Sequence, residues 1–176
     1  MTDPVEPMLL DELADWLGGS IWVGERLFET LGAWSTDESR PDRRVRFAIG
    51  SRRLGEHSRL WRDQLPDSPA LDVGPRIVPP RPGWNDAVSV LAELDPADRL
   101  VAFDEIVVPV LVQRVHSLLG RLRAVSDASV IRAGRIVAAD LAELGFGVLS
   151  PSAADREAVR RRPAIRRLSS LVGLTG

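Results

Sequence analysis

Apolar residues recur three and four positions apart through most of this 176-residue chain, and that spacing constrains its fold more than any other feature. An α-helix returns a side chain to the same face after three or four residues, whereas a strand changes face at every residue. No segment shows the alternating, β-branched pattern that is typical of a strand series. The sequence therefore predicts an all-α protein.

Four long segments each carry one apolar stripe, and each is expected to form a helix. Residues 9–17 are expected to form either a short amphipathic helix or the lead-in to the first of them, and Gly18-Gly19-Ser20 could break or kink the chain at that point. Pro109 should kink the third long helix, because proline removes a backbone hydrogen bond. The four long helices are predicted at 20–34, 43–64, 96–124 and 128–149.

The lengths of the connections indicate how these helices pair. The first two helices are joined by a short link, as are the last two, so each pair should form an antiparallel hairpin. The link over 66–95 is Pro-rich, holds a short helical piece at 85–94, and is long enough to return along the bundle. Four helices with one long crossover form the ferritin-like arrangement, and an up-down bundle with a disordered insert is the alternative. We expect one bundle over 1–150, followed by a basic helical tail over 151–176.

Four short motifs carry a resemblance to a known superfamily. They are "RRLGEHSRLWRDQLP" in the second helix, "PPRPGW" in the link, "LDPADRL" at the start of the third helix and "AADLAELGFGVL" in the fourth. Together they resemble uncharacterised actinobacterial members of the ferritin-like superfamily, over roughly residues 10–150. The resemblance implies a four-helix bundle. Members with a di-iron site use a Glu from two helices and Glu-x-x-His from the other two, and some hydroxylate substrates, including tRNA bases.

This chain keeps only part of that ligand set. His57 stands where the histidine of the second helix would be, but Leu54 replaces the glutamate three residues earlier. Asp140 and Glu143 have the right spacing in the fourth helix, but Glu143 replaces a histidine. Glu25 matches the single carboxylate of the first helix. Glu25, His57, Asp140 and Glu143 are therefore the candidate metal ligands, and they apply only if a divergent iron site exists.

The third helix supplies no matching carboxylate. Counting outward from the turn near residue 126 places Val112 and Pro109 level with the two acidic positions of the fourth helix. Asp104 lies on the apolar stripe but more than one turn away from that level, at 1.5 Å per residue. The predicted site therefore lacks at least one carboxylate and one histidine.

Each candidate ligand also has a purely structural interpretation. A histidine on an apolar stripe is more often a hydrogen-bonded core residue than a metal ligand, which applies to His57. Glu25 is about level with Arg53 across the first hairpin, so these two side chains are expected to form an ion pair. Asp140 and Glu143 flank their stripe and are expected to be solvated or paired with arginine.

Composition excludes several chemistries. The chain has no cysteine, which excludes disulfides, thiolate zinc sites, iron–sulfur clusters and cysteine nucleophiles. It has no lysine and no tyrosine, which excludes Schiff-base lysines and tyrosine acids. A net charge of −2 gives no overall field that favours nucleic acid. No run approaches the roughly 18–20 apolar residues of a membrane span, and the acidic N-terminus shows no secretory signal, so we expect a cytoplasmic protein.

The C-terminal tail is the most basic part of the chain. Residues 156–167 hold six arginines against one glutamate, and an apolar face follows from Ile165 to Val172. A helix packed across its own bundle would explain both features. A tail that docks a partner protein, or that touches an anionic surface weakly, is the alternative. One arginine cluster without interleaved aromatic residues is poor support for nucleic-acid binding.

The incomplete ligand set leads to three functional hypotheses. The first is a metal-free, non-catalytic member of the superfamily that needs no cofactor. It would act as a binding or scaffold module and pair as a homodimer or with a partner through a helix face. The second is a divergent di-iron or mononuclear iron oxidase or hydroxylase that uses the four candidate ligands. The third is a bundle that binds a small ligand in an apolar cavity at the vacated metal position.

Overall fold

The computed structural model describes residues 8–68, 71–72, 74–145 and 153–173, and within them every regular element is helical. No strand occurs in these ranges, so the all-α prediction is confirmed there. None of the described helices is long and apolar enough to cross a membrane. The elements are α1 Leu10–Asp37, α2 Pro41–Arg62, η1 Gly74–Arg76, α3 Gly83–Ala92, α4 Pro96–Ala102, η2 Phe103–Val107, α5 Val108–Leu119, α6 Ala128–Gly145, α7 Ala153–Arg160 and α8 Pro163–Val172.

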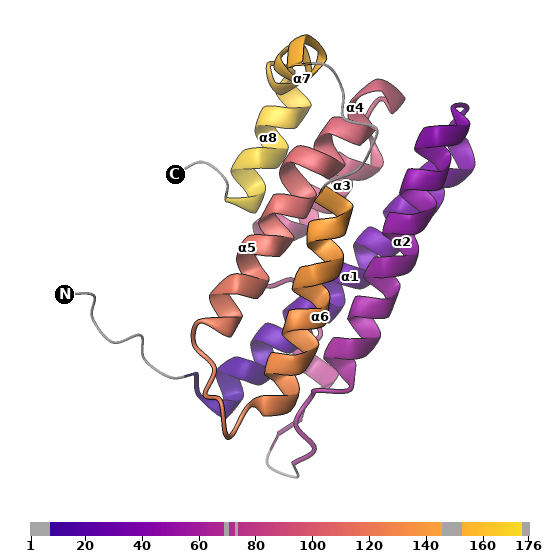
Figure 1. Cartoon of the computed structure of the whole chain (residues 1–176). Helices are drawn as coiled ribbons and strands as arrows, with labels where there is room; N and C mark the ends of the chain where they lie inside the picture. The colour runs from indigo at the N-terminus through magenta and orange to yellow at the C-terminus, as the bar shows by residue number, and fades with distance from the viewer. Residues whose placement is uncertain (1–7, 69–70, 73, 146–152, 174–176) are drawn as a thin grey trace, which may run out of the picture.

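Two helical hairpins form the body of the molecule (Figure 1). In the first, α1 packs along α2, and in the second, α5 packs along α6. Contacts between α2 and α6 join the hairpins, while α3 lies between α1 and α8. The stripes expected from the sequence face inward, except that Phe28 of the first stripe is exposed, and the largest side chains in the core have almost no exposed surface. They include Leu17, Ile21, Phe47, Leu54, Phe103, Leu118 and Leu141.

The first helix is continuous through Gly18 and Gly19, so residues 10–17 are the lead-in to the first long helix and a break at the glycines is wrong. The two glycines serve the packing of the long link instead. A Cβ atom on Gly18 would overlap the carbonyl of Arg76, and one on Gly19 would lie 2.9 Å from Cβ of Pro80. Arg76 also pairs with Asp15 at 2.7 Å, which fixes the link to α1. Without side chains, the glycines allow the link to lie directly on the helix.

The third predicted helix is divided in three. It begins as α4, widens into the π-helical turn η2 and continues as α5, of which Pro109 is the second residue. Proline cannot donate the next helical hydrogen bond, and a π turn accommodates that loss. The disturbance expected at Pro109 therefore takes the form of a π turn just before it. The helix ends at Leu119 rather than near 124. The fourth predicted helix matches α6 from residue 128, and its last four predicted residues lie outside the described ranges.

The described part of the tail lies against the bundle. Ile165, Leu168 and Val172 of α8 are buried, and α8 packs on α3. The guanidinium of Arg81 donates to the carbonyl of Val172, at the end of α8. In α7, Arg160 forms an ion pair with Glu105 of η2 at 2.6 Å. The apolar face of the tail is thus covered by its own chain.

Candidate functional site

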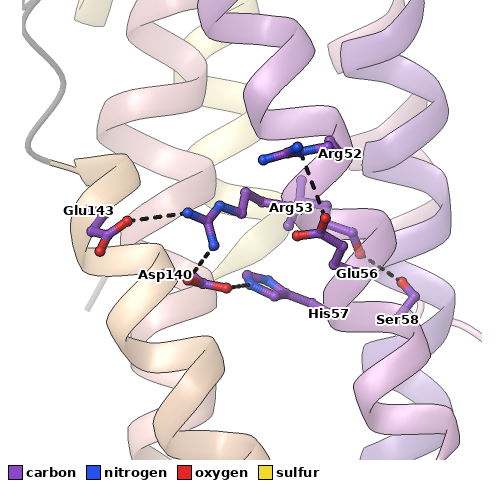
Figure 2. A network of polar contacts seen from close by, with 8 residues as sticks. Arg52, Arg53, Glu56, His57, Ser58, Asp140 and Glu143 are labelled. Atoms are coloured by element: carbon purple, nitrogen blue, oxygen red, sulfur yellow. Dashed lines mark hydrogen bonds and ion pairs between the residues drawn. The ribbon is translucent and has the colours of Figure 1, made fainter.

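His57 lies on the inner face of α2, where the sequence pattern places it. Leu54 and Trp61 lie one turn to either side on the same stripe and are buried, and His57 itself is only 3% exposed. Its Nε2 atom lies 3.1 Å from Oδ2 of Asp140, on the facing helix α6 (Figure 2). The structure thus brings together two of the predicted ligands, from the two hairpins.

Arg53, one turn before the histidine on α2, occupies the space between the acidic residues of α6. Its Nη1 donates to Oδ1 of Asp140 at 2.6 Å, and its Nη2 donates to Oε2 of Glu143 at 3.3 Å. Figure 2 shows the guanidinium between the two carboxylates. Both oxygens of Asp140 are therefore engaged, one by Arg53 and the other by His57.

The environment of His57 favours its neutral form. Burial lowers its pKa below the ordinary histidine value, while the hydrogen bond to Asp140 and the charge of that carboxylate oppose the shift. Because the carboxylate can only accept, the neutral ring carries its proton on Nε2 and donates it to Asp140. His57 is thus a buried, neutral donor.

The fourth candidate ligand lies in a different ion pair. Oε1 of Glu25 lies 2.6 Å from Nη2 of Arg62, and both side chains are substantially exposed. The expected pair between Glu25 and Arg53 is wrong, because Arg53 reaches across to α6. Helical side chains lean toward the N-terminus of their own helix. In an antiparallel hairpin, Glu25 on α1 leans away from the connecting turn and an arginine on α2 leans toward it. Glu25 therefore meets Arg62, which lies farther from the turn than Arg53, the residue at equal distance from it.

These contacts do not fit an iron site. Within the described residues, no group of three or more histidine or acidic side chains is placed to hold a metal ion. The nearest approach is the pair of His57 and Asp140, and the cation beside it is the guanidinium of Arg53. The distance between His57 and Asp140 alone would allow a shared metal, but one oxygen of Asp140 already accepts a hydrogen bond from Arg53 and the other lies in contact with His57.

Arg46 and Asp104 form a separate buried ion pair. Nη2 of Arg46 lies 2.6 Å from Oδ1 of Asp104 and also donates to the carbonyl of Leu144. Burial raises the pKa of Asp104, and the charge of Arg46 opposes that shift. Arg46 lies seven residues before Arg53, which is about 10 Å along α2. As the sequence indicates, Asp104 is therefore not part of the group around His57.

His57 also lines a cavity of about 30 Å³ in the middle of the bundle. The walls come from α1, α2, α5 and α6, and most of them are apolar. The polar members are Ser20, His57 and Arg114, and the apolar ones include Leu54, Trp61 and Val137.

Arg114 is a functional candidate that the sequence analysis missed. It lies on α5, and its Nη2 donates to the hydroxyl of Ser20 at 3.3 Å. The guanidinium carbon lies 5.4 Å from the ring centre of Trp16 and 5.9 Å from that of Trp84. Burial, followed by the charge of Arg81, lowers the pKa of Arg114 to about 10. A signal existed in the sequence, since Arg114 lies three residues after Leu111 and four before Leu118, both on the apolar stripe of its helix.

A wider groove runs along the outer face of α5 and α6. Its volume is about 870 Å³, and Asp104 and His116 line it together with apolar residues such as Val112 and Leu141. His116 is exposed there and belongs to a different face from His57.

Comparison with known proteins finds no matching family model, no matching curated protein and no matching solved structure. The fold and the side-chain geometry therefore carry the functional argument. Two features stand out in that geometry, namely the ion-paired group around Arg53 and the central cavity beside it.

Proposed function

We propose that this chain is a ferritin-like helical bundle that binds no metal at its centre and acts as a non-catalytic binding or scaffold module. The observation that carries the proposal is the position of Arg53 between Asp140 and Glu143. Two helical hairpins joined by a long link support the ferritin-like part. The motifs that resemble the superfamily lie in these same elements.

The charge of Arg53 opposes a metal ion at this position. Two unit charges about 4 Å apart interact by about 4 kcal/mol at an effective dielectric constant near 20. A divalent ion bound to Asp140 would face roughly twice that repulsion, and it would also have to displace one hydrogen bond of the carboxylate. Leu54 offers no carboxylate that could offset this loss.

Among the described residues around His57, the polar groups do not form a nucleophilic site either. His57 would need a hydroxyl or thiol within hydrogen-bond distance to act as a base on a side chain. Ser58, its neighbour in sequence, donates instead to the carbonyl of Leu54 at 3.0 Å (Figure 2). Within the described residues, the hydrogen bond to Asp140 is the only one that the ring of His57 makes.

A second candidate function, the small-ligand-binding bundle, is favoured by the central cavity. The cavity lies beside His57, at the level where a ferritin-like metal site would be. It contains a cation, a hydroxyl and aromatic rings, which are the groups that orient a small ligand. This function agrees with the proposed non-catalytic role, and it names a small molecule as what the binding module would bind.

Metal analysis of the purified chain tests the first proposal. The wild type and His57→Ala should be produced in iron-supplemented medium, and their iron content should be measured per chain. We expect no iron above background in either protein. Iron at one or two ions per wild-type chain, lost in His57→Ala, would overturn the proposal and favour the iron oxidase or hydroxylase instead.

A further inference from the structure

The cavity contains an arginine for which the described chain supplies no counter-ion. The buried or half-buried arginines Arg46, Arg53 and Arg76 each pair with a carboxylate at 2.6 or 2.7 Å. Arg114 forms no such pair with any described residue, and its one hydrogen bond goes to the neutral hydroxyl of Ser20. A guanidinium removed from water is stable only when its charge is balanced or well solvated.

The surroundings of Arg114 stabilise the cation only in part. The faces of Trp16 and Trp84 attract it, but neither ring supplies a negative charge. The nearby charge of Arg81 adds repulsion. Even with a pKa of about 10, Arg114 stays protonated at neutral pH. The cavity therefore has one uncompensated positive charge.

We infer that this cavity binds a small monocarboxylate whose carboxylate group pairs with Arg114. Arginine presents two parallel N–H donors that match the two oxygens of a carboxylate. The hydroxyl of Ser20 lies within reach of the same group, because it already contacts Arg114. The inference rests on the small-ligand-binding function above and not on the metal argument.

Charge and polarity select the class of ligand. The neutral ring of His57 donates a hydrogen bond to Asp140 and adds no positive charge to the cavity. Among the described residues, Arg114 is the only charged side chain that lines the cavity, and Arg81 lies outside the lining, so one charge faces the ligand and matches a monoanion better than a sulfate or phosphate. The walls formed by Leu54, Trp61 and Val137 would contact a methyl group or short alkyl end.

Size limits the ligand to a few atoms. A cavity needs about 10–15 Å³ to hold one water molecule, so 30 Å³ accommodates two or three water-sized groups. Formate, with three non-hydrogen atoms, is of this size, and acetate, with four, is at the upper limit. Trp16, Ser20 and Arg114 are only partly buried, so this side of the cavity is where a ligand would enter.

The test measures binding of acetate to the full chain, with acetamide as its neutral counterpart. Saturation-transfer NMR and thermal unfolding should be recorded at constant ionic strength in a buffer without carboxylates. Three proteins are compared, namely the wild type, Arg114→Met and Arg59→Met. Arg59 is an exposed arginine of α2, so its variant removes the same charge from the surface.

We expect acetate to bind the wild type and Arg59→Met equally, and Arg114→Met at least tenfold more weakly. Equal acetate binding in all three proteins would overturn the inference, as would no binding to the wild type. Binding of acetamide as tight as that of acetate would also overturn it, while the small-ligand-binding function would stand.

A second variant keeps the test decisive if Arg114→Met does not fold. Val137 lines the cavity and is buried, and Val137→Ile adds one methylene group, which would take up about a third to a half of the space for water-sized groups. The guanidinium stays in place in this variant. We expect acetate binding to fall at least tenfold, and unchanged binding would show that the anion binds elsewhere.

Discussion

Replacing Asp140 by alanine should destabilise the fold more than any other single change among the predicted ligands. The side chain of Asp140 is 16% exposed, and its two oxygens bind residues of the opposite hairpin. Its removal leaves the buried ring of His57 without an acceptor for its proton. It also removes the shorter of the two bonds of Arg53, while the bond to Glu143 remains.

The size of the effect follows from these two losses. A buried donor left without a partner costs about 1–3 kcal/mol, and a hydrogen bond to a charged group contributes about 1.5–3 kcal/mol. The contribution of the hydrogen bond between Arg53 and Asp140 must be reduced, because Arg53 is 29% exposed and keeps Glu143 as a carboxylate partner. We therefore expect Asp140→Ala to lower the free energy of unfolding by about 2–3 kcal/mol.

Urea unfolding followed by circular dichroism measures this change, and thermal unfolding provides a second readout. At about 2–4 °C per kcal/mol for a domain of this size, the melting temperature should fall by about 5–10 °C. Glu143→Ala is the matched control, because that carboxylate is 73% exposed and its pair with Arg53 should contribute little. Equal destabilisation by the two variants would refute the view that Asp140 is the central acceptor of the group.

Three further predictions follow from the packing and the charges. Gly18→Ala should lower the free energy of unfolding in urea by about 1–3 kcal/mol, because the new Cβ meets the backbone of Arg76. Gly32→Ala in the same helix should be neutral or stabilising. The reverse order would show that the link does not pack on Gly18 as described. Burial lowers the pKa of His57, so the neutral ring contributes to stability above about pH 6.5, and this contribution is lost as the pH falls through the lowered pKa. His57→Gln should therefore reduce the loss of stability to urea between pH 7 and pH 5. An unchanged pH dependence in this variant would count against the role of His57. Glu105→Gln should speed amide hydrogen exchange in α7 but not in α2, because Glu105 forms ion pairs with two arginines of α7. Equal changes in both helices would show that these ion pairs do not hold α7 in place.

Periodicity predicts the helices of this chain well, because each long stripe faces one continuous core. Both α2 and α6 begin within two residues of their expected starts. The break at Gly18-Gly19 was wrong because glycine has two uses in a helix. It weakens the helix locally, but it also lets another segment approach, and only the position of Arg76 and Pro80 shows which use applies.

The sequence also predicted part of the group around His57. The spacing of Leu54, His57 and Trp61 placed the histidine in the core, and arginine pairing was one interpretation of Asp140 and Glu143. The identity of the arginine could not be read from the sequence. Arg53 lies one residue before Leu54 and looks like a surface residue, yet its long side chain reaches the other hairpin.

Arginine accounts for both the ion-paired group around His57 and the polar side of the overlooked cavity. A guanidinium can bind two carboxylates at once, as Arg53 does, and its stem can follow an apolar surface while the head stays polar. Counting an arginine as a solvated residue is therefore unsafe where it lies three or four positions from a core residue. Arg53 lies four positions before His57 and finds carboxylates on the opposite helix. Arg114 lies four positions before Leu118 and contacts two tryptophans but no described carboxylate. Because of this difference, Arg53 is a structural residue and Arg114 is a candidate for binding an anion.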